Sequence, residues 1–324
     1  MAKIVFFNHY HRGDLLTHKE YVRQLKQELP DVEFEYMHFN HSKLTRDLDI
    51  PKTGSPTDLD AKTPFYQEED TLYINTWIGC FGDMFCGHGG INMDSLWHQW
   101  QKIFETVNAA FGVELKLNAE KESYLPSIDF SRFDTTSIDQ YLSNSIGIKK
   151  ILICNGAPQS GQSFSYDMSD FIHSTAKEYS DVHFICTTKF DTKETNILFT
   201  DDIIKDTEIE DEKRAPWEDK GFCDLQEISY LSEHADAIVG KNSGPFVFCE
   251  TKTNYMNSSK KFLSYNVSWG EAFQTGAKKP TETMSNNMNL ECDYKIVPIS
   301  DIHNLTDADA TNIKNSLNEL ANSL

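Results

Sequence analysis

Short apolar runs and amphipathic segments alternate along the chain. Residues 3–8 (KIVFFN) are a nearly continuous apolar run, which predicts a buried strand. Apolar residues then recur at spacings of seven, three and four, as one face of a helix requires. They are Leu15, Val22, Leu25 and Leu29. Pro30 ends this helix, and residues 32–39 predict a second strand, so we expect the chain to open with a strand, a helix and a strand.

The same alternation continues to residue 110 and starts again at residue 148. The pattern predicts further strands at 72–79, 148–156, 182–189, 237–242, 261–267 and 294–299, and helices at 92–110, 166–179, 224–235, 245–256 and 306–322. Polar segments separate these elements at 40–70, 118–147 and 206–219. Strands that alternate with helices twice over predict two α/β domains with parallel sheets, at 1–147 and 148–324.

The composition agrees with two folded domains. A chain of 324 residues exceeds the size that one hydrophobic core usually serves, and 39% hydrophobic residues are enough for two cores. The formal charge of -20 would repel a phosphate backbone, which argues against nucleic acid as a partner. The first residues hold too short an apolar run for a signal peptide, and no later run reaches about 18 residues. We therefore expect a soluble, cytoplasmic protein without a transmembrane segment.

Seven cysteines are scattered through the chain, mostly within apolar segments. This distribution favours reduced, buried thiols over a disulfide framework. Cys80, Cys86 and His88 carry metal-binding atoms, but their spacing matches no standard zinc pattern. We therefore expect no metal site.

Three loops lie where open α/β sheets bind ligands, after predicted strands and before predicted helices. In the loop KNSGPFVF at 241–248, Asn242 and Ser243 carry hydrogen-bond donors, and Gly244 lets a ligand approach the backbone. An anion, particularly a diphosphate, would be stabilised there. The alternative is the ordinary start of a capped helix.

The second loop is NGAPQSGQS at 155–163, directly after the first strand of the second half. It is rich in small, hydroxyl and amide residues. It lacks both the GxxxxGK[ST] of a P-loop and the GxGxxG of a dinucleotide site, which argues against a kinase-type ATPase and a simple dehydrogenase. The alternative is a flexible turn.

The third loop is NHYHRGD, which precedes the first helix. Asp14 at the start of a helix would lie near backbone amides that favour its ionised form, and in a cleft it could take a proton from an attacking hydroxyl. His9, His11 and Arg12 could bind anionic substrate groups or stabilise a leaving phosphate. The alternative for Asp14 is a first-turn carboxylate that only stabilises its helix.

Two of these segments resemble a known family. RGDLLTHKEYVRQL at 12–25 resembles the first loop of heptosyltransferase-like glycosyltransferases, and LSEHADAIVGKNSGPFVF at 231–248 resembles a segment of their second domain. The resemblance implies the GT-B fold, in which two Rossmann-like α/β/α domains face each other across a cleft. It also implies a nucleotide-sugar donor in the C-terminal domain and a glycan or other hydroxyl-bearing acceptor held mainly by the N-terminal one.

The resemblance also implies roles for individual residues. Asp14 would be the general base of an inverting transfer, and Lys189 could reach the nucleotide. His11 and Arg12 are further catalytic candidates beside Asp14, without an assigned role. The residues implied along the donor are Asn155, Gly156, Ser160, Ser163, Asn242, Ser243 and Gly244, with Glu250 at a ribose hydroxyl. The alternatives are a solvated strand end for Lys189 and a surface helix charge for Glu250.

Two departures from the family are visible. The family usually has aspartate where Asn242 stands and a histidine soon afterwards, whereas Phe246, Val247 and Phe248 follow here. The region 80–100 has no counterpart. From it, His88, Asn92 and Asp94 are expected to shape the acceptor pocket together with His9, while Trp97 could belong to this pocket or to the core.

The chemistry needs no cofactor. A sugar diphosphate carries its own leaving group, so amides and helix ends can stabilise the departing charge without a metal. We therefore expect a metal-independent glycosyltransferase. Two other classes stay open. A nucleotide-sugar epimerase would need a second acid/base group near the sugar, such as His9, His11 or Asp94, and a noncatalytic binding protein would need none.

Overall fold

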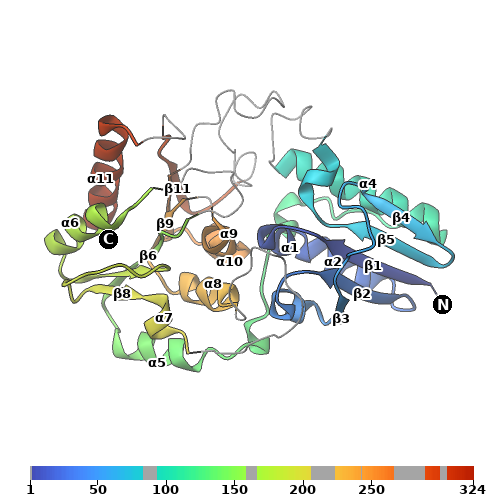
Figure 1. The fold of residues 1–324 in the computed structure, drawn as a ribbon, viewed down its shortest axis with the longest axis horizontal. Helices are drawn as coiled ribbons and strands as arrows, with labels where there is room; N and C mark the ends of the chain where they lie inside the picture. Colours follow the sequence, from blue (N-terminus) through green and yellow to red (C-terminus); the bar gives the residue numbers. More distant parts are fainter. Residues whose placement is uncertain are drawn as a thin grey trace.

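A computed structural model describes residues 2–82, 93–157, 166–205, 223–241, 243–265, 289–299 and 305–324. These residues form two α/β units that lie side by side, with the N-terminus on the outer edge of the first unit (Figure 1). Each unit is built on a sheet in which parallel pairs dominate. The predicted fold class, two Rossmann-like α/β units, is therefore confirmed.

The first sheet has the strand order β3-β2-β1-β5-β4. Its strands are β1 (Lys3–Asn8), β2 (Glu33–His38), β3 (Lys52–Gly54), β4 (Phe65–Glu68) and β5 (Thr71–Asn75). β1 pairs in parallel with β2 and β5, and β4 closes the edge by pairing with β5 in antiparallel fashion. The polar segment 40–70, which the pattern predicts as a loop, thus contributes two short edge strands.

The helices of the first unit are α1 (Arg12–Thr17), α2 (Lys19–Glu28) and α4 (Met93–Phe111), with short 3-10 turns η1 (Ser42–Leu48), η2 (Ile78–Phe81), η3 (Lys121–Tyr124) and η4 (Phe130–Arg132). The single helix expected after β1 is divided at His18, which ends α1 and begins α2. The His18 side chain is fully buried between Tyr21 and Trp100.

The second sheet has the order β11-β10-β9-β6-β7-β8, with every pair parallel. Its strands are β6 (Lys149–Cys154), β7 (Val182–Cys186), β8 (Ile197–Phe199), β9 (Ala237–Gly240), β10 (Lys261–Ser264) and β11 (Asp293–Ile296). The helices are α5 (Thr136–Asn144), α6 (Ser169–Glu178), α7 (Thr200–Ile203), α8 (Leu225–Glu233), α9 (Gly244–Cys249), α10 (Lys252–Tyr255) and α11 (Asp307–Asn322). The helix expected at 245–256 is therefore two short helices, α9 and α10.

The apolar run of β6 explains how this sheet is covered on both faces. Ile151 and Ile153 pack into one core cluster with residues of α6 and α11, whereas Leu152 and Cys154 pack into another with residues of α8. Successive strand residues point to opposite faces, so a strand buried on both sides is apolar at every position.

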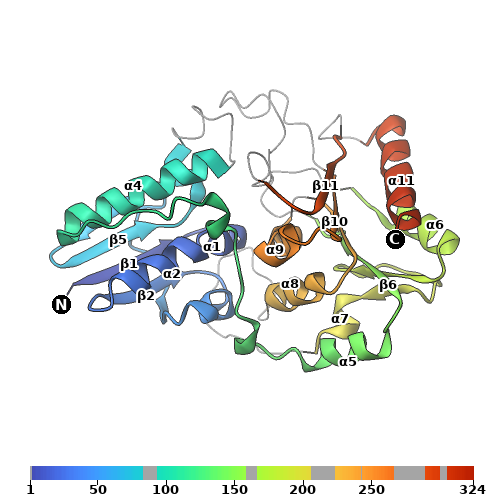
Figure 2. The ribbon, with the colours of Figure 1, turned by 180° about the vertical axis from the view of Figure 1, so that it is seen from behind.

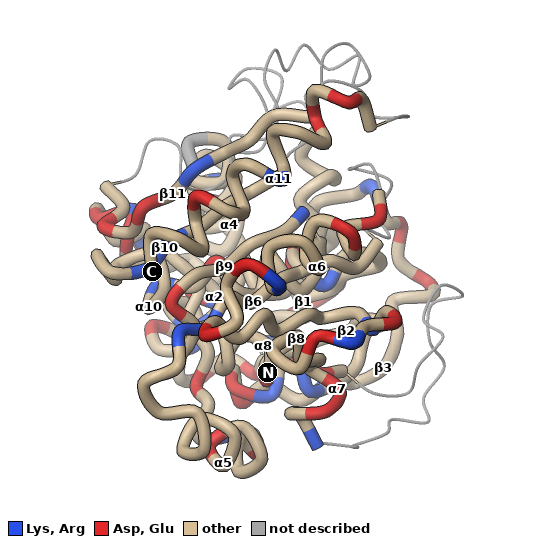
Figure 3. The backbone as a smooth tube through the Cα atoms, turned by 90° about the vertical axis from the view of Figure 1, so that its left-hand side faces the viewer, with Lys and Arg blue, Asp and Glu red and all other residues tan. Residues whose placement is uncertain are grey.

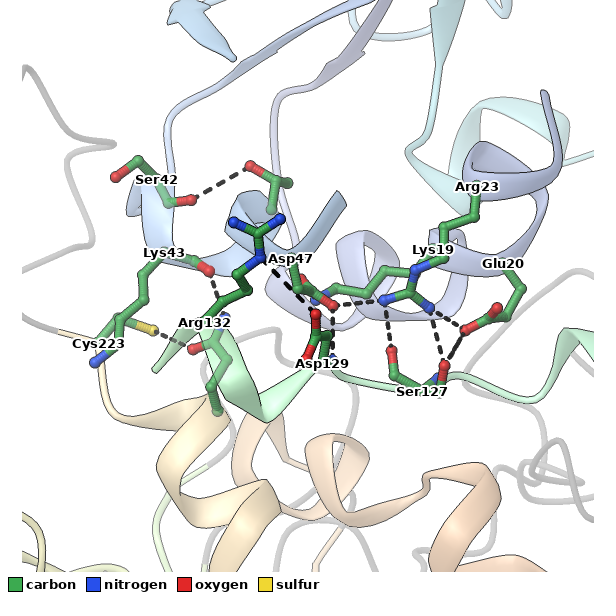
Figure 4. A network of polar contacts seen from close by, with 12 residues as sticks. Lys19, Glu20, Arg23, Ser42, Lys43, Asp47, Ser127, Asp129, Arg132 and Cys223 are labelled. Carbon is green, nitrogen blue, oxygen red and sulfur yellow. Dashed lines mark hydrogen bonds and ion pairs between the residues drawn. The ribbon is translucent and has the colours of Figure 1, made fainter. Parts of the chain in front are cut away.

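The chain passes from the first unit to the second through residues 121–135, which contact both units. Arg23 of α2 donates to the Ser127 hydroxyl at 3.0 Å, and its other amino group contacts Asp47 of η1 at 2.5 Å (Figure 4). One residue earlier, the Pro126 carbonyl accepts the backbone N–H of Lys252 at 2.8 Å. Leu125 and Ile138 pack into the core of the second unit, and the domain division at 147 remains a prediction.

Charged residues of both signs are distributed over the described chain (Figure 3). Several cations lie beside carboxylates, as in the pairs Lys149–Asp236 at 2.9 Å and Lys295–Glu319 at 3.1 Å. Among the helices that the structure describes, none combines the length and the apolar character that crossing a membrane requires.

Candidate active site

The carboxyl ends of β1, β2 and β5 are tied together by buried side chains. Asn8, at the end of β1, donates its amide to the Thr76 hydroxyl at 3.2 Å, and Tyr36 of β2 donates its hydroxyl to the same oxygen at 2.7 Å. The Thr76 backbone N–H donates in turn to the Phe7 carbonyl at 2.8 Å. The loop before α1 and the turn after β5 therefore leave the sheet next to each other.

This arrangement brings Asp14 to the turn η2. Asp14 is the third residue of α1, its side chain is only 9% exposed, and its Oδ2 accepts the backbone N–H of Ile78 at 3.1 Å. Burial raises the pKa of Asp14 to about 7, although the Ile78 N–H acts in the opposite direction. The expectation that helix amides would favour the ionised carboxylate is therefore wrong, because loss of water outweighs them.

A second aspartate at the same helical position shows how Asp14 differs. Asp309 is the third residue of α11, and its carboxylate accepts the Thr306 backbone N–H in a capping box. In α1 the capping residue His11 makes no side-chain cap hydrogen bond. The reciprocal capping box seen in α11 is therefore not formed in α1, and the first-turn alternative for Asp14 stays open.

The turn η2 depends on a glycine that contacts an aromatic ring. A Cβ atom on Gly79 would lie 2.4 Å from the ring of Trp77, which itself packs on Tyr10 with ring centroids 4.6 Å apart. Gly82 ends the same turn, and nothing described lies within 4 Å of its Cβ position.

Replacing Gly79 with Ala is expected to displace Trp77 and to lower the free energy of unfolding by about 1–3 kcal/mol, as overpacking does. Gly82→Ala is the matched control, since the same methyl group would meet no described atom within 4 Å. Thermal unfolding of both variants checks this, and equal midpoints for the two would contradict the packing described here.

The other residues predicted in this loop have different surroundings. His9 packs near the rings of Phe7 and Phe39, and burial lowers its pKa. Burial also lowers the pKa of His11. The charge of Arg12 affects Asp224, which precedes α8 in the second unit. Burial raises the pKa of Asp224, and the positive charge of Arg12 partly opposes this rise. The roles predicted for His9, His11 and Arg12 remain predictions.

On the second unit, Asn155 joins the loops that follow β6 and β7. Its Oδ1 accepts the Thr188 backbone N–H at 2.9 Å, and its Nδ2 donates to the Thr188 carbonyl at 2.9 Å. A Cβ atom on Gly156 would lie 2.8 Å from the Thr188 hydroxyl oxygen, so this glycine permits the close approach. The exposed Lys189 pairs with Asp202 at 2.7 Å. Donor contacts by these residues remain predictions.

Between β9 and α9 the structure describes Lys241 and Ser243. Gly240 is required at the end of β9, because a Cβ atom would lie 2.7 Å from that of Cys154. Ser243 is 6% exposed, and its hydroxyl has no hydrogen-bond partner among the residues that the structure describes. Lys241 is 1% exposed and directly follows β9. The sequence interpretation did not name Lys241, although a lysine within an otherwise apolar strand end was a visible signal.

Glu250 lies at the other end of α9 from Ser243. It is 5% exposed, it accepts the Tyr294 hydroxyl at 2.9 Å, and burial raises its pKa to about 7. The alternative of a surface helix charge is therefore wrong. The predicted contact with a ribose remains a prediction.

Several predicted site residues cannot be placed. Outside the described residues lie His88, Asn92, Ser160, Ser163 and Asn242. Asp94 belongs to α4, but its side chain is not described. Trp97, one turn further on, is half-buried against the first core and meets the Tyr124 ring edge-on.

The two halves of the candidate site meet through α1 and α9, which lie side by side in both views of the ribbon (Figures 1 and 2). A Cβ atom on Gly13 would lie 3.2 Å from Cγ1 of Val247. Phe248 of α9 belongs to the core cluster of the first unit. The base candidate Asp14 and the turn at Ser243 are thus carried on two helices in direct contact.

Within the described residues no three or more His, Cys, Asp or Glu side chains are grouped so that they could hold a metal ion.

Comparison with known proteins gives likenesses of fold. No family profile and no curated protein matches the sequence. The E. coli heptosyltransferase WaaC with ADP-2-deoxy-2-fluoro heptose is 9% identical, with a TM-score of 0.48 over 98% of this chain and 99% of that chain. E. coli ADP-heptose lps heptosyltransferase II is 11% identical, with a TM-score of 0.46 over 100% and 99%. A family 9 glycosyl transferase from Veillonella parvula is 10% identical, with a TM-score of 0.44 over 100% and 98%.

These structures are what the chain is similar to, with identities of 9–11% and TM-scores below 0.5. One fold hosts many activities, so an activity must be argued from the site.

Proposed function

We propose that this protein is a glycosyltransferase that moves a sugar from a nucleotide-sugar donor to an acceptor hydroxyl, with inversion and without an essential metal. Asp14 of the first unit takes the proton of the acceptor hydroxyl. The acceptor oxygen attacks the anomeric carbon, and the bond from that carbon to the diphosphate breaks. The donor lies on the second unit, along Asn155, Gly156, Ser243 and Gly244.

The observation that carries the proposal is the setting of Asp14. A general base works best when its pKa lies near the working pH, and burial raises the pKa of Asp14 to about 7. The Ile78 N–H holds one carboxylate oxygen and thereby orients the group. An aspartate that only stabilised its helix would gain nothing from this burial.

The second unit supports the leaving-group side of the proposal. The negative charge that develops on the departing diphosphate needs hydrogen-bond donors that are already in position. The Ser243 hydroxyl is buried and has no acceptor among the described residues, so it is available to donate to a phosphate oxygen. The contact of α1 with α9 keeps this turn near the helix that carries Asp14.

A thermal-shift panel tests the donor site. ADP, UDP, GDP and their sugar conjugates are each added to the whole protein, and at least one is expected to raise the unfolding temperature. A ligand at about 100-fold its Kd adds about 2.7 kcal/mol to the free energy of unfolding. Inorganic phosphate at the same concentration is the control for unspecific anion effects. No shift with any nucleotide would contradict the proposal.

Product analysis with the selected donor separates transfer from the other classes. Transfer is expected to consume the nucleotide sugar only when an acceptor is present and to release the free nucleoside diphosphate. An epimerised sugar formed without an acceptor would overturn the proposal in favour of an epimerase. A bound donor that is never consumed with any acceptor would favour a noncatalytic binding protein.

A further inference from the structure

Lys241 differs from the other buried lysines in how its charge is compensated. Among the described residues, the buried lysines are Lys19, Lys43, Lys150, Lys241 and Lys260. Lys19 and Lys43 form ion pairs with the buried carboxylates of Asp47 and Glu227. Two of the others donate to several backbone carbonyls: Lys150 to those of Ser145 and Ile148, and Lys260 to those of Ser232, Glu233 and Ala235.

The Lys241 ammonium has one described hydrogen-bond acceptor, the backbone carbonyl of Tyr166 at 2.9 Å. The Tyr166 ring lies 5.0 Å from the charge. An ammonium has three donors, and burying it with few partners costs free energy. In a protein that binds an anion at this point, the bound ligand would offset that cost.

The position of Lys241 indicates where an anionic ligand could bind. Lys241 directly precedes the turn in which the Ser243 hydroxyl is buried and lacks a partner among the described residues. Tyr166 lies shortly before α6, so the contact from Lys241 to its carbonyl joins the end of β9 to the start of α6. Both groups can serve the same anionic ligand.

We infer that Lys241 binds the diphosphate of the donor and holds the segment before α6 against the turn at Ser243. This inference rests on the proposed function and adds to it a charged residue that the family resemblance does not supply. The ammonium donates to a phosphate oxygen while it keeps the Tyr166 carbonyl, so donor binding and loop position depend on one side chain.

The groups around Lys241 determine the pKa of its ammonium. Burial lowers its pKa to about 8, and the Asp167 carboxylate opposes this change. Asp167 itself accepts the Ser169 backbone N–H at 2.9 Å, at the start of α6. Tyr265, after β10, and Asp309, on α11, act on the neighbouring Tyr166. As pH rises through about 8, Lys241 loses its proton, and an anionic ligand loses its partner.

The test measures ADP affinity by isothermal titration between pH 7.5 and 9.5, where the phosphate of ADP is already fully ionised. The wild type is expected to bind less tightly as pH rises. Lys241→Met is expected to weaken binding by roughly ten- to a hundredfold at pH 7.5 and to remove the pH dependence. Lys241→Arg retains a positive charge over this range and is expected to keep most of the affinity with a flat profile.

Lys260→Met is the matched control, because Lys260 is equally buried and burial lowers its pKa to about 8 as well. It is expected to change the unfolding temperature but neither the ADP affinity nor its pH profile. If Lys241→Met folds and shows the ADP affinity and pH profile of the wild type, the inference is overturned but the proposed donor site is not. If Lys241→Met does not fold, the wild-type pH profile in Lys241→Arg overturns the inference in the same way. A wild type that binds none of ADP, UDP and GDP would overturn both.

Discussion

Replacing Asp14 with Asn is expected to slow sugar transfer by about a hundred- to ten-thousandfold, the range that a positioned general base contributes. Asn has the same shape, and its carbonyl oxygen can still accept the Ile78 N–H, so the site should stay intact. Donor affinity should change little, because the proposed donor site is on the second unit. The measurement is kcat together with the Kd for the nucleoside diphosphate.

Asp309→Asn is the matched control for this substitution. Asp309 occupies the same third helical position and is 3% exposed, but its carboxylate completes the capping box of α11. Its replacement should cost about 0.5–2 kcal/mol of stability and leave the transfer rate close to that of the wild type. Equal losses of rate in the two variants would mean that Asp14 acts only through its helix.

The pKa of Asp14 also predicts how activity and stability depend on pH. Transfer needs the ionised carboxylate, so the rate should rise as pH increases through about 7. Stability should change in the opposite direction. A carboxyl whose pKa is raised on folding binds its proton more tightly in the folded state, and this contribution is lost as pH rises from about 4 through 7. Asp14→Asn should therefore gain unfolding temperature relative to the wild type between pH 5 and 8.

Replacing Glu227 with Leu is expected to lower the free energy of unfolding by about 3–5 kcal/mol, because it leaves a buried charge without its partner. Glu227 of α8 contacts Lys43 of η1 at 2.5 Å, and the two side chains are 0% and 2% exposed. The neighbouring Gln226 donates to the Lys43 backbone carbonyl at 2.9 Å. This pair joins the two units at a second point besides the contact of α1 with α9. Lys43 lies near Cys223 in Figure 4.

A double variant separates the loss of the pair from the loss of packing. Lys43→Met combined with Glu227→Leu removes both charges, and most of the stability lost in the single variant should return. Glu319→Leu is the control for an exposed pair, since Lys295 and Glu319 are 56% and 69% exposed, and it should cost less than about 1 kcal/mol. Losses that simply add in the double variant would show that the two charges are not coupled.

The central strands of both units were predictable because their signal is local. A strand covered on both faces is apolar at each position, as residues 151–154 of β6 are. Glycine and proline in the NSGP segment marked the turn before α9 for the same reason. The division of the first helix at His18 and the edge strand β4 were not predictable, since they depend on packing against other parts of the chain.

The sequence by itself determined the order of the central strands and the longer helices and the loops in which polar side chains gather, because apolar period and turn chemistry are properties of neighbouring residues. The tertiary structure decided what those side chains can do. The Ile78 N–H reaches Asp14 from 64 residues away, Tyr294 reaches Glu250 from 44, and the Tyr166 carbonyl meets Lys241 from 75. Desolvation and the number of hydrogen-bond partners set the charge of each group, and both depend on atoms that only the folded chain brings together.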